Sequence, residues 1–213
     1  MQPLSPLLRG AVAVSFIVCL ASLTILVVRT FSFGKRPLRA RPRGSAAGGI
    51  AYAFGAGMMP WEKESARKHI PTYTAGILYH AGIFASFLAL LAVIMPFEIG
   101  ELLQAAFHIF LAAGFAAGTF LLAKRMLVPA MRPISCPDDF ASNIIVTIFI
   151  ASAFTAPFVP VASTVLAGMS ILVLLYIPLG KIRHCFFFFY TRILFGLFFG
   201  RRGVLPHHAA IEE

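Results

Sequence analysis

Five long stretches of this sequence carry few charges, and they restrict the fold more than any other feature. A helix of about 20 apolar residues crosses the hydrocarbon core of a bilayer. Inside that core the backbone must satisfy its own hydrogen bonds, which a helix does. The sequence therefore predicts an all-α integral membrane protein with five transmembrane helices. Their expected ranges are residues 10–28, 73–95, 101–123, 139–155 and 161–190.

The composition supports a single membrane domain over residues 1–213. Hydrophobic residues make up 59% of the chain and the mean hydropathy is +0.87, more apolar than a soluble domain can bury. The charged residues, 12% of the total, lie mostly between the apolar stretches. Outside the helices we expect a basic, glycine-rich cytoplasmic loop over residues 29–70 and a cytoplasmic tail over residues 191–213.

The formal net charge of +10 does not indicate a nucleic-acid-binding protein. The Lys and Arg residues flank the apolar stretches, where such residues orient helices and contact anionic headgroups. The sequence also contains no nucleotide-binding loop, metal-hydrolase motif or recognisable nucleophile. We therefore expect membrane lipid as a partner, no nucleic acid, and no substrate chemistry by this chain alone.

The basic residues also predict the orientation. Except for Arg9, every Lys and Arg lies in the connection between the first and second helices, in that between the third and fourth, or after the core of the fifth. The two remaining connections contain only Glu98 and Glu101 as charged residues. The positive-inside rule then places the N-terminus outside and the C-terminus in the cytoplasm, in the cytoplasmic membrane of the cell. An odd number of helices requires the same arrangement.

Two histidines lie at similar depths in this topology. His80 is about seven residues into the second helix, roughly 10 Å from its cytoplasmic end, and His184 lies near the cytoplasmic end of the fifth helix. Ionisable residues inside a bilayer are costly and usually functional. Two facing imidazoles in a helix bundle are typical axial ligands of a b-type haem. We expect one haem in a bundle of helices two to five; the alternative is two interfacial histidines hydrogen-bonded to backbone or headgroups.

Small and cationic residues surround the two candidate ligands. Gly82 leaves room for a macrocycle against the second helix, or else it is an ordinary close-packing residue. Arg183 and Arg67 are candidate partners for haem propionates, as are Lys181 and Arg125, although such cations often only extend to headgroups.

His108 lies on the third helix, near the opposite membrane face, and shares a helix face with Gln104. This pair is a candidate for quinone binding or proton transfer. An interhelical hydrogen bond is the simpler interpretation, and we do not expect His108 to bind the haem.

Other local patterns predict structural roles. Gly114 and Gly118 form a GxxxG motif that favours close helix packing. Asp138 and Asp139 are expected to cap the start of the fourth helix. Residues 60–68 are typical of a short interfacial helix with Trp61 at headgroup depth.

Three segments of the chain carry a recognisable set of residues. They are Lys63, Glu64, Arg67, His69, Ile70, Pro71, Thr72, Tyr73, Gly76, Tyr79, His80 and Gly82; Ile134-Ser135-Cys136-Pro137-Asp138-Asp139-Phe140; and Tyr176-Ile177-Pro178-Leu179-Gly180-Lys181-Ile182-Arg183-His184. At these residues the chain resembles the gamma subunit of respiratory nitrate reductase and the membrane cytochromes b associated with heterodisulfide-reductase-like and sulfite-reduction complexes. The resemblance covers residues 61–192 and includes a five-helix layout with the C-terminus inside.

The resemblance implies that His80 and His184 are the iron ligands of a haem b on the cytoplasmic side. In that family four histidines hold two haems, but the positions of the outer pair are Leu90 and Leu166 here. One haem is therefore expected. The resemblance further implies a hetero-oligomer in which the haem relays electrons between the quinone pool and a cytoplasmic Fe–S or catalytic subunit.

Two functions of other classes remain open from the sequence. A haem-free membrane anchor or assembly subunit would recruit a cytoplasmic complex through its basic loops, and haem content separates it from an electron-transfer subunit. A small transporter has less support, because the sequence shows no inverted repeat and no intramembrane carboxylate.

Overall fold

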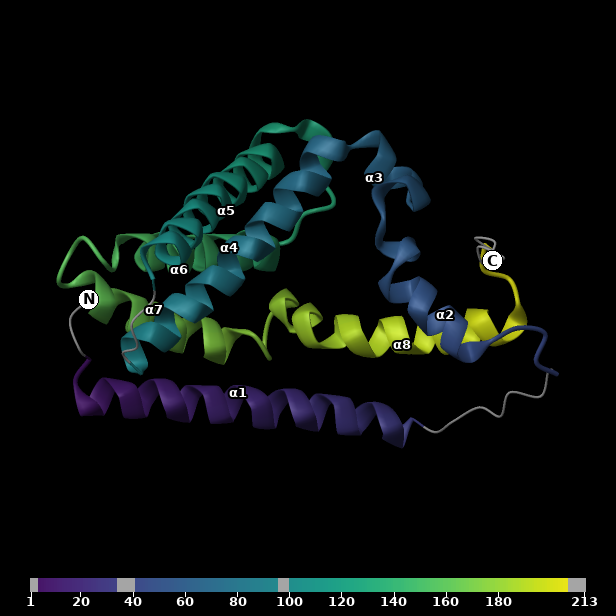
Figure 1. Cartoon of the computed structure of the whole chain (residues 1–213), viewed down its shortest axis with the longest axis horizontal. Helices are drawn as coiled ribbons and strands as arrows, with labels where there is room; N and C mark the ends of the chain where they lie inside the picture. The colour runs from purple at the N-terminus through teal and green to yellow at the C-terminus, as the bar shows by residue number, and fades with distance from the viewer. Residues whose placement is uncertain (1–3, 34–40, 96–99, 207–213) are drawn as a thin grey trace. The chain divides into compact units, whose positions relative to one another are not determined.

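The computed structural model describes residues 4–33, 41–95 and 100–206, and within these ranges the chain forms helices and loops without a β-strand (Figure 1). Among the described residues, five segments are long and apolar enough to cross a membrane, which confirms the predicted class of protein. These segments are Pro6–Ser32 (α1), Ile70–Ile94 (α4), Glu101–Leu127 (α5), Pro137–Thr155 (α6) and Lys181–Arg202, which contains α8 (His184–Arg202).

The fifth predicted helix is not one helix, so the expected range 161–190 is wrong. α7 (Ala162–Tyr176) ends two residues before Pro178, and a turn leads through a short 3₁₀ helix, η4 (Lys181–Arg183), into α8. Proline lacks the backbone N–H of a helical residue, and its ring clashes with the preceding turn. The 15 residues of α7 span about 22 Å, less than the hydrocarbon thickness of about 30 Å.

The described chain forms two compact units. The bundle unit comprises Met1–Thr24 and Pro71–Arg183, and the basic unit comprises Ile25–Ile70 and His184–Glu213. Residues 34–40 of the predicted loop, the Glu98-containing segment 96–99 and residues 207–213 of the predicted tail lie outside the described residues.

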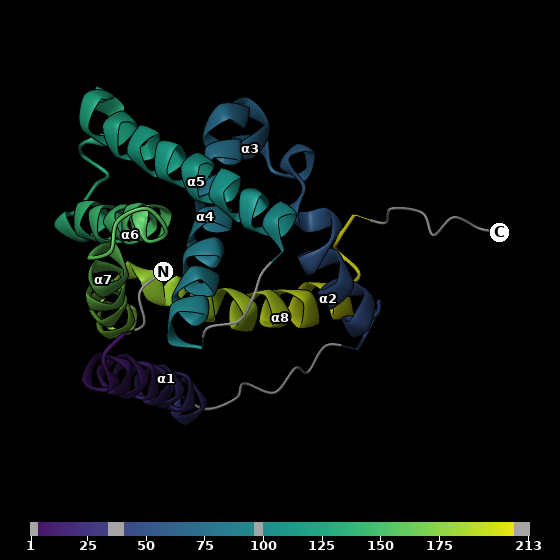
Figure 2. The ribbon, with the colours of Figure 1, turned by 60° about the vertical axis from the view of Figure 1, so that its left-hand side comes forward.

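In the bundle unit, α6 packs against both α5 and α7. Figure 2 shows α6 between these two helices. Phe149 and Ile150 of α6 and Leu166 of α7 are completely buried in the core of this unit. Many side chains on the outer faces of the helices are large, apolar and exposed, as expected of helices in contact with lipid acyl chains.

α4 crosses α5 at a point where two glycines meet. A Cβ atom built at Gly82 would lie 2.7 Å from Gly114 Cα and 3.2 Å from Phe110 O. One turn along α5, Gly118 leaves space for the ring of Tyr79 and the hydroxyl of Thr147. The packing interpretation of the GxxxG motif is therefore confirmed.

The basic unit is built on the packing of α2 (Ala46–Phe54) against α8. A Cβ atom at Gly49 would collide with Gly196 O and lie 2.5 Å from Gly200 Cα, so the two backbones are in direct contact. The preceding residues attach to the end of α8, where the N–H groups of Arg43 and Gly44 donate to Arg201 O at 2.9 and 3.2 Å. The sequence predicted no helix over residues 46–54.

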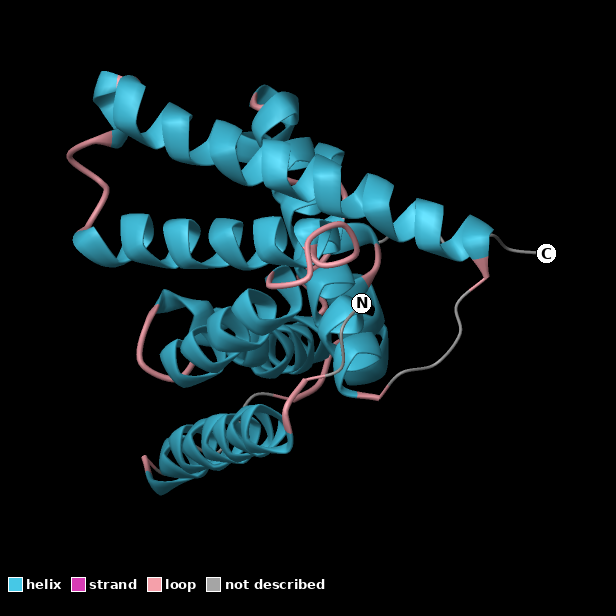
Figure 3. Ribbon diagram, turned by 90° about the vertical axis from the view of Figure 1, so that its left-hand side faces the viewer, coloured by secondary structure: helices cyan, strands magenta, loops and turns pink. Residues whose placement is uncertain are grey.

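The rest of the loop forms short helical pieces. The predicted interfacial helix 60–68 appears as η2 (Pro60–Glu62) and α3 (Glu64–Lys68), with Trp61 64% exposed. Two further 3₁₀ turns are η1 (Ala56–Met58) in the basic unit and η3 (Pro129–Met131) in the bundle unit. Partial burial, together with the nearby Arg192, lowers the pKa of Lys63. Figure 3, coloured by secondary structure, shows the described residues as helices and loops.

Candidate functional site

His80 lies in the third turn of α4, in the bundle unit, and its side chain is exposed. Its Nδ1 lies 2.7 Å from Gly76 O. A carbonyl oxygen only accepts, so Nδ1 donates this hydrogen bond, and in the neutral form of the ring the lone pair is on Nε2. That is the tautomer of a histidine that binds a metal through Nε2. A Cβ atom built at Gly76, on the preceding turn, would meet no heavy atom within 4 Å, so the space there is open.

His184 is the first residue of α8 and belongs to the basic unit, where its side chain is exposed. The division between the two units falls between Arg183 and His184. The two candidate iron ligands are thus carried by different units, and their pairing stays a prediction from the sequence.

Gly82 has the structural role that was the alternative interpretation. The space beside it is filled by Gly114 and Phe110 of α5. The glycine with open space on the candidate face of α4 is instead Gly76, four residues before His80.

The four candidate propionate partners, Lys181, Arg125, Arg183 and Arg67, differ in the contacts that the structure gives them. Lys181 Nζ contacts both carboxylate oxygens of Asp139, at 2.8 and 2.9 Å, and Arg125 Nη1 lies 3.4 Å from Asp139 Oδ2. Arg183, in η4 of the bundle unit, and Arg67, in α3 of the basic unit, have exposed side chains. Arg183 and Arg67 are therefore the better candidates of the four.

Asp139 caps α6, but the N-cap residue is Cys136. The Cys136 backbone N–H donates to Asp139 Oδ2 at 2.9 Å, and the Cys136 side chain caps the backbone of Asp139 in return. This reciprocal pairing is a capping box. The prediction that both aspartates cap the helix is therefore right for Asp139 and wrong for Asp138, whose carboxylate reaches another segment.

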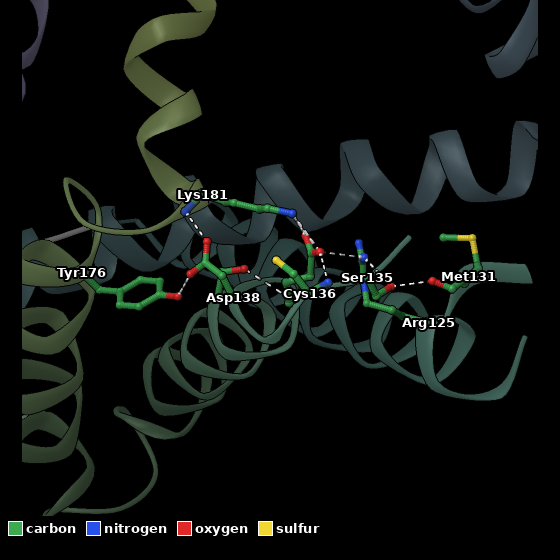
Figure 4. A network of polar contacts seen from close by, with 9 residues as sticks. Arg125, Met131, Ser135, Cys136, Asp138, Tyr176 and Lys181 are labelled. Atoms are coloured by element: carbon green, nitrogen blue, oxygen red, sulfur yellow. Dashed lines mark hydrogen bonds and ion pairs between the residues drawn. The ribbon is translucent and has the colours of Figure 1, made fainter. Parts of the chain in front are cut away.

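Asp138 joins α6 to the segment that follows α7 (Figure 4). Its Oδ1 accepts a hydrogen bond from the Tyr176 hydroxyl, and its Oδ2 accepts one from the Lys181 backbone N–H at 2.7 Å. Tyr176 is the last residue of α7 and Lys181 is the first residue of η4, so the two flank the non-helical residues 177–180. No local pattern could have indicated these contacts, because they join residues about 40 positions apart in the chain.

A second polar cluster joins α4 to α6 beside His80. The Tyr79 hydroxyl lies 3.0 Å from both Asn143 O and Thr147 Oγ1. Thr147 Oγ1 also lies 3.2 Å from Asn143 Oδ1. These bonds satisfy polar groups that would otherwise be buried among apolar side chains.

His108 does not make the expected interhelical hydrogen bond. Its Nδ1 lies 2.8 Å from Gln104 O of its own helix, and its ring contacts Phe154 and Phe158 edge-on. Its Nε2 is buried and has no hydrogen-bond partner among the residues that the structure describes. His108 lies in the second turn of α5, whereas His80 lies at the other end of the bundle, near the start of α4.

A groove of about 440 Å³ lies between α2, α8 and residues 203–206. Much of its lining is the backbone of Gly44, Gly48 and Gly200. The single titratable side chain in this lining is Tyr52, whose hydroxyl donates to Glu62 Oε2 at 3.2 Å. Neither His80 nor His184 is among the residues that line this groove.

No family model, curated protein or solved structure matches the chain. The resemblance to the nitrate reductase gamma subunit and related cytochromes therefore stays a prediction from the residues quoted above.

Proposed function

We propose that this chain is the haem b subunit of a respiratory oxidoreductase complex in the cytoplasmic membrane. His80 and His184 would be the axial ligands of one haem near the cytoplasmic face. When bound, the haem supplies one-electron redox chemistry, which suits relay between the quinone pool and a cytoplasmic Fe–S or catalytic subunit.

The observation that carries this proposal is the geometry of His80. The Nδ1 hydrogen bond to Gly76 O fixes the ring and leaves the lone pair on Nε2, the nitrogen that a haem iron takes. The open space at Gly76 lies on the preceding turn of the same helix. An exposed imidazole held in this way, within a helix long enough to cross the membrane, fits an axial ligand.

The second ligand is proposed from the sequence topology, which puts His184 at the same membrane face. Arg183 and Arg67 are the proposed propionate partners, since both carry exposed guanidinium groups. Two imidazole ligands leave no open iron position, so the residues would support outer-sphere electron transfer.

We place α8 along the cytoplasmic surface of the membrane. Basic residues lie at both of its ends, and Arg192 lies in its middle. A spanning α8 would put Arg192 near the bilayer centre, at a cost of at least about 2.5 kcal/mol. On the surface, its apolar side chains would enter the interface while its arginines contact anionic headgroups.

Haem stoichiometry tests the proposal. The pyridine haemochrome of purified wild-type protein should give one haem b per chain, and His80→Ala and His184→Ala should each lose it while still inserting. His108→Ala is the matched control, because it removes an imidazole from the opposite end of the bundle unit. Loss of haem from His108→Ala would refute the ligand assignment.

The alternative is a haem-free membrane anchor or assembly subunit. The observation that favours it is the basic unit itself, a compact body held by contact between the backbones of α2 and α8. Its surface carries exposed Arg67 and Arg202, which suit an acidic protein partner. A well-folded wild type that binds no haem but retains a cytoplasmic complex would establish this alternative.

A further inference from the structure

The connection between α7 and α8 has little regular structure of its own, but it is held tightly to the first turn of α6. One carboxylate, that of Asp138, binds both ends of the stretch 177–180: the Tyr176 hydroxyl before it and the Lys181 N–H after it. Asp139 holds the same segment a second time through the Lys181 ammonium group. Figure 4 shows these contacts converging from α6 and from the end of α7.

Gly180 makes this close approach possible. A Cβ atom at Gly180 would lie 2.6 Å from Tyr176 Cε1 and 2.9 Å from Asp138 Oδ1. Real Cβ atoms do not approach other atoms so closely, so a side chain at this position would push the connection away from the Asp138 carboxylate. The connection is therefore shaped to fit that carboxylate.

The chain leaves the bundle unit only three residues beyond Lys181, at the peptide bond between Arg183 and His184. Hydrogen bonds to an ionised carboxylate are about twice as strong as neutral ones. The hydrogen bonds of Asp138 fix the last residues of the bundle unit, and with them the position at which His184 and α8 begin. If one helix continued through Pro178, its own backbone would fix this position, but the helix ends before the proline.

We propose that Asp138 is a positioning residue for His184. It holds the connection 177–183 on α6 and so determines where α8 begins and how the imidazole of its first residue is presented. The role of Asp138 in orienting the His184 imidazole rests on the proposed function, because only a bound haem makes that orientation functionally important.

Three measurements on the purified full-length protein test it. Hydrogen exchange over residues 177–187 reports whether Asp138 holds the connection, with or without haem. The low-temperature EPR spectrum of the ferric haem reports the relative orientation of its two imidazole planes through the largest g value, and a redox titration gives the haem midpoint potential. The variants are Asp138→Ala and the milder Tyr176→Phe. The control is Ser135→Ala, which removes a 3.0 Å hydrogen bond to Arg125 at the same end of α6 without touching the connection.

We expect the Lys181 amide to exchange about tenfold faster in Asp138→Ala, since its hydrogen-bond acceptor is lost. The largest g value and the haem midpoint potential should shift in both variants, in the fraction of protein that keeps haem, and stay at wild-type values in Ser135→Ala. A merely structural role would lower the yield of folded protein without moving the g value or the potential.

Unchanged exchange in Asp138→Ala would overturn the proposal at its first step. Faster exchange with an unchanged g value and potential would overturn the positioning role. A wild type without haem would refute the proposed function and the role toward a haem ligand together, and the exchange rates would then show separately whether Asp138 holds the start of α8.

Discussion

Gly82 and Gly114 bring the backbones of α4 and α5 into direct contact. A Cβ atom at either glycine would lie within 2.7 Å of the Cα atom of the other. Because the lipid tails around a membrane helix are as apolar as its side chains, helices associate there through such close packing. This crossing fixes α4, which carries His80, against the rest of the bundle unit.

Substitution of Gly82 by alanine should therefore destabilise the protein. We expect a loss of about 1–3 kcal/mol in the free energy of unfolding, because the added methyl group must push α5 away. Titration with a denaturing detergent, followed by circular dichroism, measures this change. Gly168→Ala on α7 is the control, since a Cβ atom there would meet no heavy atom within 4 Å. Equal stability of Gly82→Ala and wild type would contradict the crossing.

Two neighbouring glycines in α2 offer a sharper comparison in the basic unit. Gly49→Ala should separate α2 from α8 and expose the amides of residues 46–54 to hydrogen exchange, because its Cβ would collide with the backbone of α8. Gly48→Ala should leave exchange at or below the wild-type rate, since its Cβ would be at an ordinary 3.4 Å from Ser45 Cβ. Similar exchange in the two variants would contradict the α2–α8 packing.

The Tyr79 hydroxyl should stabilise the bundle through Thr147. Tyr79→Phe and Thr147→Val should each lower the free energy of unfolding by about 1 kcal/mol, the usual net value of one hydrogen bond. Because both changes remove the same 3.0 Å contact, the double variant should lose less than the sum. A double-mutant cycle in detergent measures the coupling, and strictly additive losses would show that the two groups do not interact.

The number of membrane crossings should leave the C-terminus in the cytoplasm. α7 and α8 are separate helices, so only one of them can cross if the total is five, and the position of Arg192 argues against α8. A reporter active only in the cytoplasm, fused after Glu213, should give signal, and one active only outside should not. The opposite result would mean that the number of crossings is not five or that the chain is inverted, and in either case the positive-inside rule would not be obeyed at Arg201 and Arg202.

The sequence was sufficient for the features that depend on local composition. Uncharged stretches placed α1, α4, α5 and α6 within a few residues of their observed bounds, because helix formation in a bilayer follows directly from apolar length. The break at Pro178 was also signalled locally, but the predicted helix was continued through it. Membrane helices tolerate proline, so one proline in an apolar stretch does not by itself predict that the helix ends there.

Features that depend on contacts distant in sequence were not accessible in this way. α2 is a nine-residue helix with two glycines, too short to be stable alone, and it is held by the backbone of α8. The Asp138 contacts with Tyr176 and Lys181 could not be read from either segment alone. Of the candidate site, the sequence indicated His80 and His184. The structure was needed to find the hydrogen bond that orients His80 and the contacts of Lys181 and Arg125 with Asp139.

The visible spectrum of the purified protein tests the central claim most directly, as a dithionite-reduced minus air-oxidised difference. We expect the sharp α and Soret bands of a low-spin b-type haem in the wild type and in His108→Ala. The bands should be absent from His80→Ala and His184→Ala that still insert into the membrane. A well-folded wild type without these bands, or either histidine variant with unchanged bands, would contradict the assignment of His80 and His184 as the ligands of a single haem.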